Sequence, residues 1–238
     1  MGGKRRRAWS LGPVGTVALS LATACGASPG TAVRVTVTGM TTEAATEPDD
    51  ADDDVPLGHD TSVYEALLRL GKVTLHTDGD PVASGAAVNV NLLATTTLFE
   101  AEVGATALRN LTVEVPPPSG DGVRRGESVS VFAAGVMNKV AFTYRDQTMD
   151  AVDVELEAEL GAAPVVVAVL FDLTQWFKDV DSEGLEPDEV GEYRLDDEHN
   201  DAVALGIEAN IRASVSAHVG DKPTTPTGST VVSLDAGR

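Results

Sequence analysis

Apolar and acidic residues alternate without a break from Val152 to Leu160, and this pattern constrains the fold more than any other part of the chain. The apolar positions are Val152, Val154, Leu156, Ala158 and Leu160, and the acidic positions between them are Asp153, Glu155, Glu157 and Glu159. A period of two places the two kinds of side chain on opposite faces of an extended strand. The pattern predicts a half-buried β-strand with one apolar face and one acidic face.

Similar strand signals recur along most of the chain. Alternating segments lie at residues 33–37, 66–70, 73–75, 88–92, 111–115 and 129–144. The run from Val165 to Phe171 is entirely apolar, which is typical of a central strand. The buried face changes at Gly71 and Lys72, which predicts a bulge or bend there. With Gly, Pro and Asp punctuation between the segments, the fold class is expected to be mainly β, as an antiparallel β-sandwich or barrel-like domain.

The last third of the chain has a different pattern. Asp172 or Thr174 is expected to cap a short helix that contains Trp176 and Phe177, and an acidic loop follows over residues 178–201. Apolar residues at four-residue spacing from Val203 to Val215, preceded by Asn200 or Asp201 as a cap, predict a helix. Odd positions from 207 to 219 also alternate, so a strand remains an alternative. We therefore expect a helical C-terminal portion, with a last edge strand over residues 231–234.

One acidic run interrupts the early strands. Residues 41–60 carry five aspartates within six positions, flanked by prolines. Such a run cannot bury itself and predicts a loop or disordered insertion. The expected organisation is a signal peptide (1–24), a tether (25–31), a strand plus acidic low-complexity segment (32–62) and a β-rich domain (63–238).

The charge balance limits the possible partners. The chain carries 17 basic and 37 acidic residues, a net charge of −20. Four of the basic residues and none of the acidic ones precede residue 25, so the remainder has 13 against 37, a net charge of −24. A field of that sign repels nucleic acid and anionic lipid and gathers cations. Nucleic acid is therefore not an expected partner, whereas divalent cations are possible ones.

The N-terminus has the three parts of an export signal. Lys4 and three arginines form a basic start, and an uncharged stretch from Ala8 to Ala24 ends in small residues before Cys25. That stretch is too short and too rich in Gly and Ser to be a permanent membrane span. Cleavage is expected between Ala24 and Cys25.

The segment Leu21-Ala22-Thr23-Ala24-Cys25 resembles the lipobox of bacterial lipoproteins. The resemblance implies that the Cys25 thiol receives a diacylglyceryl group, that a signal peptidase cuts before it, and that the new amine is often acylated. Two or three acyl chains anchor a protein stably, whereas one chain does so only marginally. The resemblance implies a location in the cell envelope, at an outer membrane or cell surface. The alternative is an ordinary signal peptide with an incidental cysteine.

A looser resemblance concerns the segments from Phe171 to Phe177 and from Asn210 to Ser214. They look like parts of uncharacterised β-domain lipoproteins of the envelope. Because these proteins are uncharacterised, the resemblance implies no activity and no catalytic residue.

Few residues suggest chemistry. The sequence contains no G-x-S-x-G elbow, phosphate-binding loop or dinucleotide fingerprint, and its four histidines lack the spacing of a metal site. No catalytic residue is identified, and the chain is not expected to be an enzyme. Asp179, Asp181 and Glu183 with the following glycine match the start of a calcium loop, but Val190 stands where the closing glutamate belongs. These three residues are calcium candidates, and a solvated acidic loop is the alternative.

The sequence thus predicts an envelope-tethered lipoprotein with a binding or structural role. Its membrane contact would run through the lipid on Cys25, and a protein or glycan partner is left open. Two alternatives remain. One is a secreted hydrolase whose site carries no recognisable motif, and the other is a calcium-binding surface protein.

Overall fold

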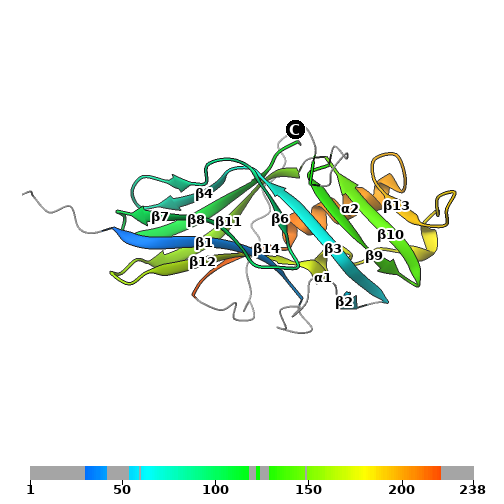
Figure 1. The fold of residues 1–238 in the computed structure, drawn as a ribbon, viewed down its shortest axis with the longest axis horizontal. Helices are drawn as coiled ribbons and strands as arrows, with labels where there is room; N and C mark the ends of the chain where they lie inside the picture. Colours follow the sequence, from blue (N-terminus) through cyan, green and yellow to red (C-terminus); the bar gives the residue numbers. More distant parts are fainter. Residues whose placement is uncertain are drawn as a thin grey trace, which may run out of the picture.

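Strands dominate the fold, as the period-two patterns predict (Figure 1). The computed structural model describes residues 30–41, 54–58, 60–117, 122–123, 129–147 and 149–220. Within these ranges the strands form three sheets. The prediction of a mainly β fold is confirmed.

The first sheet is built around the apolar run. Its order is β14-β12-β1-β7, with β1 (Thr31–Met40), β7 (Thr96–Val103), β12 (Val165–Asp172) and β14 (Val215–Val219). β12 lies between two strands, so the predicted central strand is confirmed. β1 pairs with β12 in parallel, with Val33 opposite Val165. This parallel pair is an exception to the antiparallel sandwich or barrel that the patterns predict; the two strands lie far apart in the chain, so no short hairpin requires them to run antiparallel.

The second sheet contains β2 (Val55–Gly58), β3 (Thr61–Leu70), β6 (Val88–Asn91), β9 (Val131–Met137), β10 (Val140–Asp146) and β13 (Tyr193–Leu195). β9 and β10 form an antiparallel hairpin, and β3 pairs with β9. β13 adds to β10 in parallel, with Phe142 opposite Tyr193. This second parallel pair brings the acidic loop of the last third beside the end of β10.

The expectation of a loop up to Asp60 is wrong at residues 55–58, which form the strand β2. Val55 and Leu57 are buried, while Pro56 between them is exposed. Their alternation covers only two apolar residues and directly follows a run of aspartates, so the sequence does not indicate a strand here. Residues 42–53 and His59 lie outside the described residues. β1, which precedes this region, packs into the same core as the strands after Val63.

The third sheet has the order β11-β8-β4-β5, with β4 (Val73–Thr77), β5 (Val82–Ala83), β8 (Ala107–Val115) and β11 (Met149–Glu159). At Gly71 and Lys72 the chain leaves β3 and enters this sheet, which is the predicted bend. On β11, Val154 and Leu156 are buried, whereas the acidic residues between and beside them are exposed. The predicted acidic face is therefore confirmed.

Two helices and one short 3₁₀ turn cover the right-hand part of the molecule in Figure 1: α1 (Leu173–Trp176), η1 (Ser182–Gly184) and α2 (Asp201–Ala213). Asp172 caps α1, since its Oδ1 accepts a hydrogen bond from the Thr174 backbone N–H at 3.0 Å. Asn200 precedes α2 but makes no side-chain cap. The side chain of Asn200, one of the two expected caps, therefore does not cap this helix.

The expectation of a helical C-terminal portion is not supported. α2 has 13 residues and ends at Ala213, and β14 follows it and pairs with β12. The Ser214 hydroxyl donates to the Ile211 carbonyl oxygen at 2.7 Å, which ends the helix. Residues 221–238, including the expected edge strand at 231–234, lie outside the described residues.

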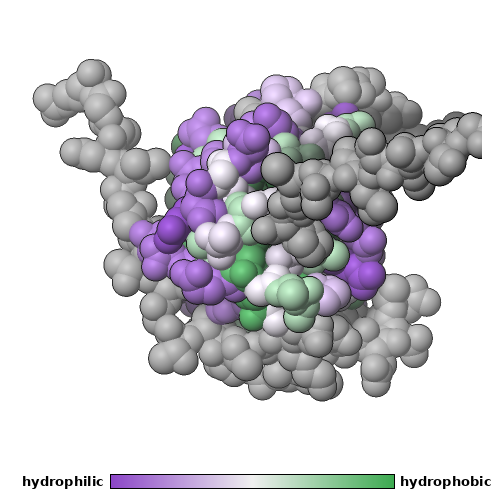
Figure 2. Space-filling model, turned by 90° about the vertical axis from the view of Figure 1, so that its left-hand side faces the viewer, coloured by the Kyte–Doolittle hydropathy of each residue, from purple (hydrophilic) through white to green (hydrophobic). Residues whose placement is uncertain are grey.

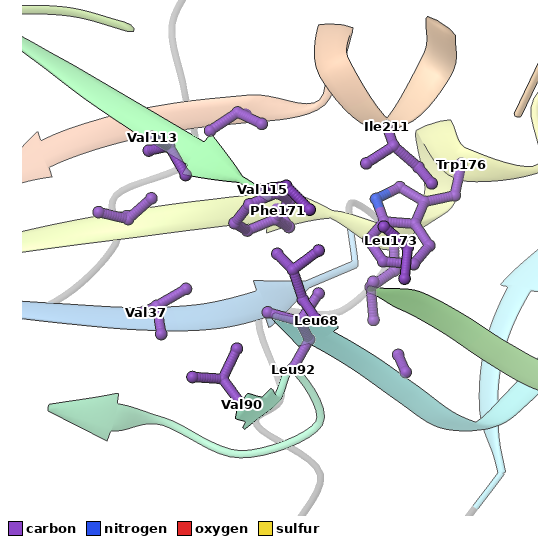
Figure 3. Close-up of a cluster of buried hydrophobic side chains, with 14 of the residues drawn as sticks. Val37, Leu68, Val90, Leu92, Val113, Val115, Phe171, Leu173, Trp176 and Ile211 are labelled. Carbon is purple, nitrogen blue, oxygen red and sulfur yellow. The ribbon is translucent and has the colours of Figure 1, made fainter. Parts of the chain in front are cut away.

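One continuous core joins the three sheets and both helices. Figure 3 shows its centre, where Trp176 of α1 lies beneath Ile211 of α2 and close to Leu173. The Trp176 ring meets Phe171 edge to face at 6.4 Å between centroids. The tryptophan is fully buried, which agrees with its interpretation as a core anchor.

The export signal lies outside the described part of the chain. Residues 1–29 contain the expected signal peptide, its cleavage site at Ala24 and the lipidation site at Cys25, so these remain predictions. Among the described residues, no helix has the length and apolar character needed to cross a membrane.

Candidate binding cleft

A surface cleft of about 420 Å³ opens between the end of β10, the loop after β13 and the first turns of α2. It lies in the half of the domain away from the start of β1 (Figure 1). The lining residues are Val129, Tyr144, Arg145, Asp146, Gln147, Arg194, Asp196, Asp197, Glu198, Asp201, Ala204, Leu205 and Glu208. Six of these carry a carboxylate and two carry a guanidinium group, so the cleft is acidic.

Asp196 organises the loop on one side of the cleft. Its Oδ1 accepts hydrogen bonds from the backbone N–H groups of Glu198 at 3.1 Å and His199 at 2.8 Å. The His199 ring lies 3.1 Å from the same oxygen, and Arg194 donates to Oδ2 at 2.9 Å. Burial raises the pKa of Asp196, but the bonds from His199 and Arg194 outweigh it, so the pKa lies below its ordinary value. Asp196 is therefore a buried structural anion.

Tyr144 forms the floor of the cleft beside a second carboxylate. Its hydroxyl donates to Asp146 Oδ2 at 3.1 Å, while the ring is buried in the main core. Burial, followed by the charge of Asp146, raises the pKa of Tyr144 far above its ordinary value. The phenol therefore stays protonated and keeps donating to Asp146. This leaves the Asp146 carboxylate held in a fixed orientation at the cleft.

Two guanidinium groups against six carboxylates leave the cleft with a net negative charge. Arg194 is engaged by Asp196, and the Arg145 guanidinium lies 6.0 Å from the centroid of the Phe132 ring. Arg212 does not line the cleft, but it pairs with Glu208, which does, and lies 3.2 Å from Asp150. The carboxylates of Asp197, Glu198 and Asp201 are exposed at the rim. A positively charged ligand with a small apolar part fits such a lining better than an anion does.

Asn200 holds the acidic loop against the start of α2. Its Oδ1 accepts from the Glu186 backbone N–H at 3.0 Å, and its Nδ2 donates to the backbone carbonyls of Glu186 at 3.1 Å and Arg194 at 2.8 Å. Its backbone adopts a left-handed conformation with φ 54°. The side chain that was expected to cap α2 thus fixes the loop, and with it the wall of the cleft.

Two of the three calcium candidates, Asp181 and Glu183, are joined by a local hydrogen bond. The Asp181 Oδ1 accepts from the Glu183 backbone N–H at 3.0 Å, and this bond caps η1. Over the ranges that the structure describes, no three side chains of the His, Cys, Asp and Glu types are placed to hold a metal ion. The described part of the loop therefore uses at least one candidate ligand for local structure.

Sequence reasoning missed the cleft residues. Tyr144 and Asp146 lie on β10 and Asp196 follows β13, and the parallel pairing of these two strands brings the two segments together. Carboxylates are so numerous in this chain that none of the three stands out by pattern. One local signal points to the floor of the cleft. Tyr144 and Asp146 are two residues apart at the end of β10, so their side chains lie on the same face and can hydrogen-bond.

Similarity to known proteins adds no assignment to this geometry. No protein-family model, curated protein or solved structure matches the chain. Any function proposed for the cleft rests on its own residues.

Proposed function

We propose that this protein is a lipid-anchored envelope lipoprotein whose β-sandwich domain binds a cationic ligand in the acidic cleft. The anchor is the acylated Cys25, and the ligand class is a primary amine or guanidinium compound with a short apolar body. The proposed role is binding, without catalysis.

The N-terminal sequence supports the anchor. A basic start, a short uncharged stretch and small residues before Cys25 are the parts that export and lipidation require. The first strand, β1, begins at Thr31, only six residues after Cys25. A domain tethered that closely would be held at the membrane surface.

The cleft is the observation that carries the proposal of binding. It is concave, its floor contains the buried ring of Tyr144, and its carboxylates outnumber its guanidinium groups by six to two. Concave sites with an apolar floor and a few convergent polar groups are the usual binding sites of small ligands. The Tyr144 hydroxyl orients Asp146 without a bound ligand, which lowers the cost of organising the site on binding.

Calorimetric titration of the Cys25→Ser protein with spermidine and with arginine amide tests the proposal at physiological ionic strength. We expect saturable binding of one equivalent of at least one probe. The Asp146→Asn/Asp201→Asn variant should weaken that binding by about tenfold or more, because both carboxylates line the cleft.

The matched control is Glu155→Gln/Glu157→Gln, which removes the same charge from the exposed face of β11. It should change the affinity by about twofold or less. Equal weakening by the two double variants would show diffuse attraction to an acidic protein. That result, or the absence of saturable binding of either probe, would contradict the proposed site.

A further inference from the structure

The chain enters the domain at one well-defined end. Thr31, the first residue of β1, is buried and lies opposite Val103, the last residue of β7. Its hydroxyl donates to the Gly161 carbonyl oxygen, in the turn between β11 and β12. The start of β1 is therefore fixed beside two turns, residues 104–106 and residues 160–164, which together we call the entry end.

The reach of the tether is short compared with the domain. Six Cα-to-Cα steps separate Cys25 from Thr31, so a fully extended tether spans at most about 20 Å. β1 alone has 10 residues and a length of about 30 Å, and it runs from the entry end towards the half that contains the cleft (Figure 1). A lipid on Cys25 therefore cannot pass along β1 to the cleft.

The surface of the entry end differs from that of the sides. Gly161, Ala162, Ala163 and Pro164 are all exposed and carry no charge. Figure 2 looks onto this end and shows hydrophobic residues gathered in its middle, with hydrophilic residues at its sides. By contrast, the outer face of β11 presents Asp153, Glu155 and Glu157 to solvent. The end is not free of charge, because Asp78 lies against it: its carboxylate accepts hydrogen bonds from the backbone N–H groups of Thr106 at 2.9 Å and Ala107 at 3.0 Å.

We propose that the entry end faces the phospholipid bilayer, so that the domain stands on the membrane with the acidic face of β11 along its side and the cleft opening at a distance. This orientation rests on the lipid anchor at Cys25 proposed above. It follows from two facts together: the fixed position of Thr31 and the short tether that precedes it.

The test uses single-cysteine labelling of the lipidated protein in phosphatidylcholine vesicles. Cys25 is the only cysteine of the chain and its thiol is blocked by the lipid, so an introduced cysteine is the only free thiol. The three positions are Ala162→Cys at the entry end, Glu157→Cys on the side of β11, and Glu189→Cys in the loop beside β13; all three residues are exposed. Each carries a fluorophore, and a phospholipid with a nitroxide headgroup serves as quencher.

We expect the fluorophore at residue 162 to be quenched at least threefold more than those at residues 157 and 189. Equal quenching at 162 and 157 would mean that the domain lies on its side, and stronger quenching at 189 would mean that it is inverted; either overturns the orientation. Vesicle flotation tests the anchor separately. If wild-type protein floats and Cys25→Ser protein does not, the anchor stands whatever the quenching shows. Thermal unfolding monitored by Trp176 emission verifies that each labelled variant is folded.

Discussion

The Trp176 indole nitrogen donates a hydrogen bond of 3.1 Å to the Ser214 hydroxyl oxygen, in the interior of the domain. This bond joins α1 to the end of α2 across 38 positions of the sequence. Because the Ser214 hydroxyl also donates to the Ile211 carbonyl, one side chain ends α2 and satisfies the indole. The wall of the cleft is built on α2, so its position depends on this contact.

Ser214→Ala should destabilise the domain by about 1–3 kcal/mol, because it leaves a buried indole N–H without an acceptor. Urea unfolding followed by fluorescence measures the effect directly, since Trp176 is the only tryptophan after the expected cleavage site. Ser216→Ala, in the half-buried strand that follows, is the control and should change the free energy of unfolding by less than about 0.5 kcal/mol. Similar losses for both variants would show that the indole bond is not the cause.

Two glycines should respond to alanine in opposite directions. A Cβ at Gly135 in β9 would lie 1.9 Å from the Ser62 carbonyl oxygen of β3, so Gly135→Ala should cost about 3 kcal/mol or more. Gly206 in α2 has no atom within 4 Å of such a Cβ, and Gly206→Ala should stabilise the helix by about 0.5–1 kcal/mol. Thermal unfolding of both variants measures the difference. A tolerated Gly135→Ala would contradict the close pairing of β9 with β3.

Asp196→Asn should change how stability depends on pH. The pKa of Asp196 is lowered in the folded protein, so its contribution is fully present above the unfolded pKa of about 3.9 and is lost as the pH falls through the lower folded value. At pH 7 the variant should be less stable by about 1.5–3 kcal/mol, because hydrogen bonds to a charged group are lost. Denaturant unfolding from pH 7 to pH 2 should show the two proteins converging below about pH 4. A constant difference over that range would show that the charge of Asp196 is not what stabilises the loop.

Divalent cations should act on the acidic loop by screening. The sequence places 11 carboxylates from Asp179 to Asp201, and their repulsion falls when any salt is added. We expect millimolar Ca²⁺ to raise the melting temperature, sodium chloride to mimic it, and Asp179→Asn/Asp181→Asn to leave the effect nearly unchanged. Asparagine at residue 181 can still accept the bond from Glu183, so the variant keeps η1. Stoichiometric, salt-resistant Ca²⁺ binding that the double substitution abolishes would instead establish a calcium site.

The elements that could be predicted are those whose pattern is local. On β11 the alternation of Val154 and Leu156 with glutamates records burial on one face only, and on β12 the unbroken apolar run records burial on both. The short strand β2 was not predicted, because only Val55 and Leu57 show its alternation and they follow a run of aspartates. The apolar pattern of a long strand therefore indicates which of its faces are buried. Two apolar residues beside a charged run are too few to indicate a strand.

Pairing partners and the cleft could not be predicted, since they depend on contacts between distant segments. Nothing near Val33 indicates that it lies opposite Val165, and nothing near Tyr193 indicates its place beside Phe142. The stretch after Asn200 carried both a helical and a strand period. The structure has a helix up to Ala213 and a strand from Val215, because Ser214 stops the one where the edge of β12 can pair with the other.

The account depends most on the anchor, and mass spectrometry of the N-terminal peptide of protein purified from membranes tests it most directly. We predict a peptide that begins at Cys25 and carries the mass of a diacylglyceryl group, with or without a further acyl chain on its amine. A peptide that begins elsewhere, or an unmodified Cys25 in membrane-bound protein, would contradict it.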